Sequence, residues 1–130
     1  MTVLTPASRD LLRTAVISLD DAYQAETPDH RYIAAHVAAL RAGAALLAVK
    51  ARPTRSARIR SVWHMVPGIA PELGEWCVFF DAIGKRRVFV EIGQDQVTQR
   101  QADDLVRDAE AFLDQIARIL NVSLPIRMAG

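Results

Sequence analysis

Apolar side chains recur at steps of three and four residues along most of this chain, the spacing that places side chains on one face of an α-helix. Thr5 and Pro6 form a typical helix start, so a first helix is expected from Pro6 to Glu26. The same signal recurs at Thr27, and a second helix is expected from there to about Arg52. The expected buried stripe of this second helix consists of Ile33, Val37, Leu40, Ala44 and Leu47.

The third apolar region is interrupted. A short amphipathic helix, with Ser56 as its candidate cap, is expected to end at Pro67, and a further helix is expected from Pro71 to Ile83. Because the apolar phase continues across the break, one long helix with a proline kink is the alternative. Residues 84–92 have strand propensity but no second strand to pair with, so further helical turns are expected there.

The last helix has the clearest pattern. Thr98 and Gln101 fit a capping box, and the helix is expected to run to Leu120. Its apolar face consists of Ala102, Leu105, Val106, Ala109, Phe112, Leu113, Ile116 and Leu120. Helices with short connections predict an all-α protein, an up-and-down bundle of four to five helices with a proline break in the third. The 130 residues are expected to form one domain, with its core at about 6–121 and a short irregular tail at 122–130.

Composition agrees with one globular domain, because 51% of the residues are apolar and 24% are charged. The net charge of +1 conceals a strong asymmetry along the chain. Residues 30–71 contain seven basic residues and no acid, whereas residues 91–114 contain seven acids and two arginines. The chain is therefore dipolar, with local charges of +7 and −5.

The N-terminal sequence lacks the basic and apolar regions of a secretion signal, so a cytoplasmic location is expected. The longest weakly polar stretch, 33–49, is rich in alanine and contains His36 and Arg41, so no membrane span is expected. Cys77 is the single cysteine, which excludes an internal disulfide and a Cys-x-x-Cys site. Its apolar neighbours indicate a buried structural thiol.

The densest basic cluster is the turn at 50–60, which contains no acid. It could neutralise the phosphates of RNA or of a nucleotide, or it could be a solvated turn whose charges pair with the acidic face of the last helix. No aromatic residue lies within it, which disfavours base stacking. The candidate phosphate-binding residues are Lys50, Arg52, Arg55, Arg58 and Arg60.

Other chemistry has little support in the sequence. No pair among His30, His36 and His64 has metal spacing with a suitable partner, and there is no glycine-rich phosphate loop or nucleophile elbow. Glu72 and Glu75 follow Pro71 directly, where the helix dipole explains acids. We therefore predict no metal and no cofactor.

Several segments together resemble a small actinobacterial family of HEPN domains (higher eukaryotes and prokaryotes nucleotide-binding). The similarity covers about residues 9–121. It implies an all-α bundle of four to five helices, often a homodimer. The superfamily includes RNA-cutting toxins, partners of minimal nucleotidyltransferases and inactive RNA-binding forms. The segments that carry the resemblance are 31–47, the basic turn, 61–63, 70–76 with Phe79 and Phe80, and 102–110 with Phe112 and Leu113.

Active HEPN ribonucleases carry an arginine followed by a histidine after four to six residues, the histidine acting on the 2′-hydroxyl and the arginine on phosphate charge. Two pairs match this spacing, Arg31 with His36 and Arg58 with His64, and about one match is expected by chance in so arginine-rich a chain. Residues five or six apart do not share a helix face. The polar residue that usually follows the family's arginine is also replaced, in these two pairs, by Tyr32 and Ile59.

We therefore expect a non-catalytic member that binds RNA or a nucleotide phosphate through the basic turn, with Arg58 and His64 the better of the two candidate pairs. A protein-interaction or dimerisation bundle without nucleic-acid binding is the alternative. A metal-independent endoribonuclease is the second alternative. By family analogy, a nucleotidyltransferase-type partner is also expected.

Overall fold

The computed structural model describes residues 4–50 and 61–124, and this part of the chain is helical without any strand. The all-α prediction is confirmed, and residues 84–91 continue a helix as expected. The elements are α1 (Pro6–Gln24), α2 (Pro28–Lys50), α3 (Val62–Ile69), a 3₁₀ turn η1 (Pro71–Leu73), α4 (Gly74–Glu91) and α5 (Gln99–Leu120).

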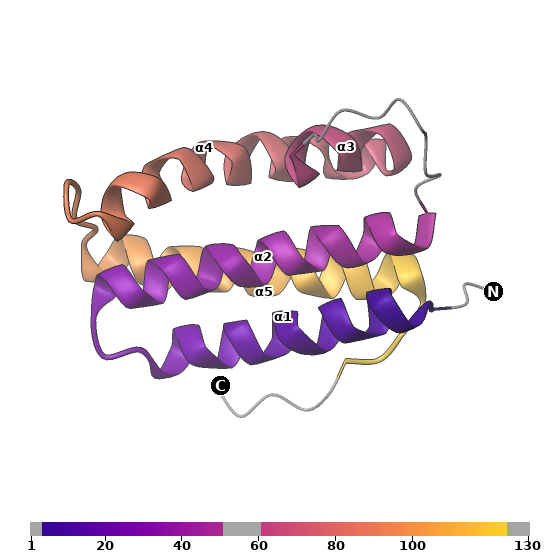
Figure 1. The fold of residues 1–130 in the computed structure, drawn as a ribbon, viewed down its shortest axis with the longest axis horizontal. Coiled ribbons are helices and arrows are strands. Elements are labelled where there is room, and N and C mark those ends of the chain that lie inside the picture. Colours follow the sequence, from indigo (N-terminus) through magenta and orange to yellow (C-terminus); the bar gives the residue numbers. More distant parts are fainter. Residues whose placement is uncertain (1–3, 51–60, 125–130) are drawn as a thin grey trace.

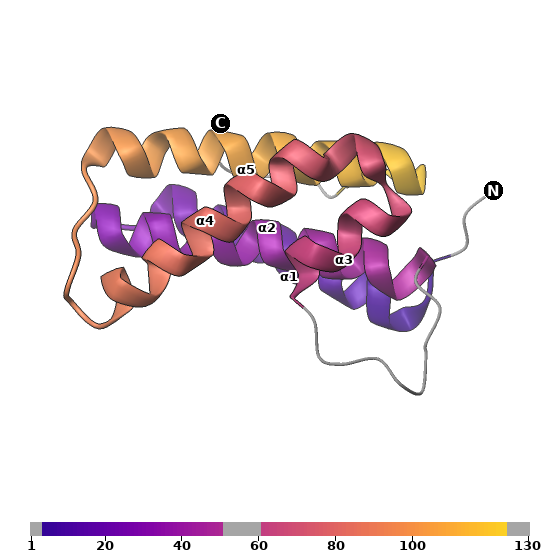
Figure 2. The same cartoon turned by 90° about the horizontal axis from the view of Figure 1, so that it is seen from above.

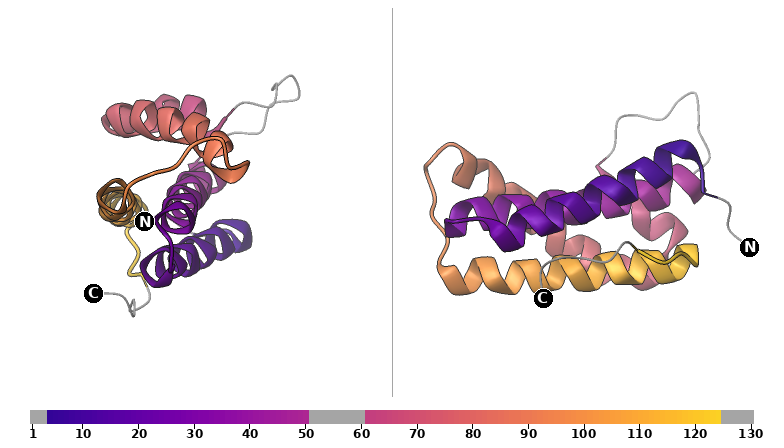
Figure 3. Two further views of the ribbon diagram at one scale, coloured as in Figure 1. Left: turned by 90° about the vertical axis from the view of Figure 1, so that its left-hand side faces the viewer. Right: turned by 90° about the horizontal axis from the view of Figure 1, so that it is seen from below.

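Helix α2 is the centre of the bundle, and α1, α3, α4 and α5 all pack against it (Figure 3). Its length and apolar composition would suffice to cross a membrane, but half of that stretch is buried inside the bundle. The expected stripe of α2 is wrong by about one position, because its members are only partly buried. Small residues occupy the tightest contacts on a helix surrounded by neighbours, and the fully buried alanines are Ala35, Ala38, Ala39, Ala42 and Ala45.

The break in the third region is a reversal of the chain. Helix α3 continues through Pro67 to Ile69, and α4 then runs in the opposite direction (Figures 1 and 2). The alternative of one kinked helix is therefore wrong, because Ala70 leaves the helical conformation and η1 separates the two helices. Ser61 caps α3 by accepting a hydrogen bond from the His64 amide at 3.3 Å, whereas the expected cap, Ser56, lies outside the described residues.

The close approach of α3 to α2 depends on Gly43. A Cβ atom at this position would lie only 2.7 Å from Cγ1 of Val62. The missing side chain therefore lets the start of α3 rest directly on the backbone of α2.

An aromatic cluster joins α3, α4 and α5. The ring of Phe80 lies 5.2 Å from Trp63, 5.7 Å from Trp76 and 5.1 Å from Phe112, measured between centroids. Phe80 and Phe112 are fully buried, and Trp63 is almost so. These rings form the apolar centre on which the second half of the bundle packs.

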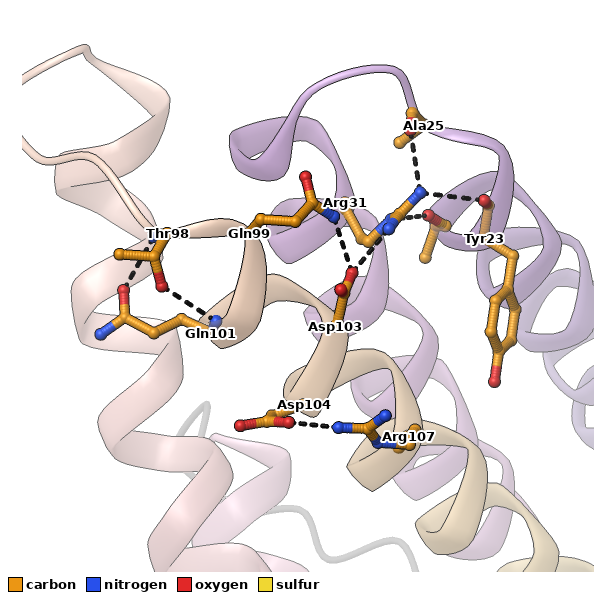
Figure 4. A network of polar contacts seen from close by, with 10 residues as sticks. Tyr23, Ala25, Arg31, Thr98, Gln99, Gln101, Asp103, Asp104 and Arg107 are labelled. Atoms are coloured by element: carbon orange, nitrogen blue, oxygen red, sulfur yellow. Dashed lines mark hydrogen bonds and ion pairs between the residues drawn. The ribbon is translucent and has the colours of Figure 1, made fainter.

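Helix α5 follows the sequence prediction closely. The Gln101 amide donates to Oγ1 of Thr98 at 3.1 Å and the Thr98 amide donates to Oε1 of Gln101 at 2.9 Å, which completes the expected capping box (Figure 4). Every member of its expected apolar face is buried.

Candidate functional site

Arg31 holds three segments of the bundle together (Figure 4). Its Nε donates to the Ala22 carbonyl at 2.9 Å, and its Nη2 donates to the carbonyls of Tyr23 and Ala25, both at 3.1 Å. Its Nη1 donates to Oδ1 of Asp103 on α5 at 2.6 Å, and this contact lowers the pKa of Asp103. The guanidinium thus satisfies carbonyls that the end of α1 leaves open. The basic and acidic segments of the chain meet at this ion pair.

Replacing Arg31 by alanine is expected to lower the free energy of unfolding by about 2 kcal/mol, because three backbone carbonyls and one carboxylate lose a charged donor. Urea denaturation followed by circular dichroism measures the change. Arg13→Ala is the matched control, since Arg13 is 64% exposed and its ion pair within residues 4–50 and 61–124 is with Asp10 of its own helix. An equal loss in the two variants would contradict the bridging role of Arg31.

His36 is buried, with 4% of its surface exposed. Its Nε2 donates to the Phe80 carbonyl at 3.2 Å, so its Nδ1 is free to accept from Nη1 of Arg87 at 3.0 Å. Burial, followed by the charge of Arg87, lowers the pKa of His36 to about 4. Gly84 makes room for the ring, because a Cβ there would lie 3.0 Å from Nε2. With both nitrogens engaged inside the protein, His36 has no position from which to contact a substrate.

Arg31 and His36 therefore do not form one site. The guanidinium of Arg31 is directed to α1 and α5, whereas the imidazole of His36 is directed to α4. The expectation that residues five apart on a helix do not share a face is confirmed for this pair. Both side chains serve the packing of α2.

His64 is exposed, at 67% of its side chain, in the first turn of α3. Its Nδ1 lies 3.0 Å from Oγ of Ser61, and its Nε2 lies 4.0 Å from Oδ2 of Asp81 on α4. Lys85 also approaches Asp81, at 3.4 Å. The expected partner of His64, Arg58, lies outside the described residues, as do Arg52, Arg55 and Arg60.

Lys50, the described member of the basic cluster, is exposed at the end of α2. The helical rise places it about 28 Å along α2 from Arg31, which binds Asp103. Asp104 pairs with Arg107 of its own helix. These two acids of α5 thus lie at the opposite end of α2 from Lys50 and have other partners.

The described residues contain neither a candidate metal site nor an accessible thiol. Residues 4–50 and 61–124 contain no group of three or more His, Cys, Asp or Glu side chains able to hold a metal ion. Cys77 is 1% exposed, and burial raises the pKa of its thiol to about 11. The prediction of a buried cysteine is confirmed.

The largest feature that sequence reasoning missed is an exposed apolar strip, which we name the outer face of α4. It consists of Val78, Val88 and Phe89 of α4 and of Ile92, the residue that caps the end of this helix, and their exposed fractions are 75%, 57%, 51% and 60%. Helix α4 carries large apolar side chains all around its circumference, but its buried residues are Cys77, Phe80 and Val90. The number of apolar residues in α4 could have indicated this exposed strip from the sequence, because one buried stripe does not need so many of them.

Comparison with known proteins identifies the family of this chain. No curated protein and no solved structure gives a significant match. The family model described as SAV_6107-like HEPN matches residues 22–117, which run from the end of α1 almost to the end of α5. Since this match covers most of the chain, the protein belongs to the SAV_6107-like HEPN family.

Proposed function

We propose that this HEPN domain is non-catalytic and acts as an interaction module that pairs with a second copy of itself. The positions of Arg31 and His36 support the non-catalytic part, because one side chain holds α1 to α5 and the other is buried against α4. Metal-independent cleavage of RNA that is abolished by His64→Ala would overturn it.

The outer face of α4 is the single observation that carries the pairing. On a helical wheel its four apolar residues fall within about 100° of one another, with Asp81 and Lys85 between them. In an antiparallel pair of α4 helices with a twofold axis near residue 83, Val78 of one copy faces Phe89 of the other. The same axis brings Lys85 of each copy to Asp81 of the other. In this arrangement apolar residues of one copy contact apolar residues of the other, and each lysine meets an aspartate. The face is therefore complementary to itself, as a twofold interface requires.

The double variant Val78→Glu with Phe89→Glu is expected to dissociate the dimer, raising its dissociation constant about 100-fold or more, because symmetry places four new carboxylates in the interface. Sedimentation velocity measures the masses, and circular dichroism shows that the variant is folded. Ile17→Glu is the matched control, since Ile17 is a 46% exposed apolar residue on α1. A monomeric wild-type protein, or equal dissociation by Ile17→Glu, would contradict the proposal.

The basic cluster at 50–60 supports a second function, the binding of RNA or a nucleotide phosphate. Its candidate residues are Lys50, Arg52, Arg55, Arg58 and Arg60. Support comes from Asp103 and Asp104 of α5, because these two acids pair with Arg31 and Arg107 and do not supply the counter-charges that the alternative of an internally paired turn requires.

Fluorescence anisotropy with a labelled single-stranded RNA tests this second function. Affinity is expected to fall steeply from about 50 to 200 mM salt, and Arg55→Gln with Arg58→Gln is expected to reduce the slope by about 2. Arg9→Gln with Arg13→Gln, on α1, removes the same charge elsewhere and is expected to leave the slope nearly unchanged. An absence of binding at low salt would leave only the self-association module.

A further inference from the structure

The outer face of α4 has a pair of opposite charges near its centre. Asp81 and Lys85 lie one helical turn apart, between Val78 and Val88 along the chain, and on the helical wheel they fall within the apolar strip. Nζ of Lys85 lies 3.4 Å from Oδ2 of Asp81, and we name these two residues the central pair. The core of a protein interface is usually depleted of charge, so a charged pair within an apolar strip is informative.

The neighbouring charges of α4 are engaged within the chain, on other sides of the helix. Arg86 donates from Nε to Oδ2 of Asp95 at 2.7 Å. Arg87 pairs with Glu91, and its Nη1 lies 3.0 Å from Nδ1 of His36. The central pair differs from them, because its lysine is 78% exposed and its aspartate is 27% exposed on the face that a second helix would approach.

We infer that the central pair selects both the orientation and the partner of the outer face, an inference that rests on the self-association proposed above. In an antiparallel pair of α4 helices, each Lys85 meets Asp81 of the other copy. In a parallel pair every residue faces its own counterpart, so aspartate meets aspartate and lysine meets lysine. Apolar residues contact apolar residues in both orientations. The charges therefore favour the antiparallel one.

The same pair discriminates among other helices with an apolar stripe. A helix that presents two charges of one sign to Asp81 and Lys85 is repelled by one of them, and an uncharged helix gains no ion pair. The best partner is a helix whose apolar stripe contains one acid and one base in reversed order. An antiparallel second copy of α4 supplies this order.

A charge-swap experiment tests the selection of the partner. Asp81→Lys and Lys85→Asp are each expected to raise the dissociation constant of the homodimer about tenfold or more, because the twofold axis gathers four like charges. An equimolar mixture of the two variants is expected to form a heterodimer whose dissociation constant lies within about threefold of the wild-type value. Sedimentation velocity with one of the two chains fluorescently labelled measures both quantities, at about 50 mM salt to limit screening.

The pair of Asp10 and Arg13 on α1 provides the matched control. Asp10→Lys and Arg13→Asp change the net charge by the same amounts as the two α4 variants, at exposed residues that also form an ion pair within one helix. Their homodimers are expected to keep dissociation constants within about twofold of the wild-type value. Circular dichroism shows that all four variants are folded.

Disulfide cross-linking tests the orientation. In the antiparallel pair residue 78 lies opposite residue 89 of the other copy, while the two copies of residue 78 are displaced by about 16 Å along the helices. A disulfide requires Cα atoms within about 7 Å. The double variant Val78→Cys with Phe89→Cys is therefore expected to form a covalent dimer under mild oxidation, and each single variant is expected to form little. Cys77 is 1% exposed and does not compete.

Three results would overturn this inference while leaving self-association intact. These are a heterodimer no tighter than either parent homodimer, equal weakening by the control variants on α1, and cross-linking of the single cysteine variants as efficient as that of the double variant. A monomeric wild-type protein would instead overturn the self-association itself, and the selection of orientation and partner with it.

Discussion

Phe80→Ala is expected to lower the free energy of unfolding by about 4 kcal/mol, which is a large part of the stability of a domain of this size. Phe80 is fully buried, and four other rings lie against it, so truncation leaves a cavity that rigid aromatic neighbours cannot fill. The cluster is also what ties α4 to α3 and α5. Urea unfolding followed by tryptophan fluorescence is the direct measurement, because Trp63 and Trp76 report on the same site.

Phe80→Leu separates the loss of volume from the loss of a specific ring arrangement. It fills most of the cavity and is expected to cost about 1 to 2 kcal/mol, and it remains measurable if the alanine variant does not fold. If Phe80→Ala cost no more than Phe80→Leu, the aromatic cluster would not be the centre of the bundle.

Acidification is expected to destabilise the protein through His36 by about 3 kcal/mol. In the folded state the pKa of His36 is about 4, below its ordinary 6.5, so between these two values the unfolded chain binds more protons. The stability from neutral His36 is therefore complete above about pH 6.5 and is lost as the pH falls towards 4. A protonated ring would also face Arg87 and lose its acceptor nitrogen, and the negative charge of Glu91 offsets only part of this.

Unfolding free energies measured at intervals from pH 7 to pH 4 test this dependence. Carboxylates titrate at the acid end of this window, so the informative quantity is the difference between the wild type and His36→Gln, whose stability should depend less on pH. His64→Gln, which removes an exposed histidine of α3, is the control variant measured in parallel. Parallel curves for the wild type and His36→Gln would show that His36 is not the responsible group.

Secondary structure followed from local patterns wherever a helix buries one face and leaves the other exposed. The capping box at Thr98 and the apolar face of α5 are examples, because both depend on residues three or four apart. The same reasoning failed for α2. Its neighbours surround it, so burial there depends on which small residues admit a close contact and not on one stripe.

The candidate site shows the same division. Spacing identified the two arginine and histidine pairs, but it could not show that Arg31 reaches carbonyls of α1 and a carboxylate of α5, or that His36 is buried against α4. The outer face of α4 was equally hidden, because its exposure depends on where α4 lies relative to its neighbours.

The sequence by itself determined an all-α domain, its helices, its buried cysteine and its division into a basic and an acidic segment, since these depend on composition and on neighbours along the chain. Only the tertiary structure decided which charges meet. It pairs Arg31 of the basic segment with Asp103 of the acidic segment, because ion pairs require side chains to lie within a few ångströms, whatever their separation along the chain.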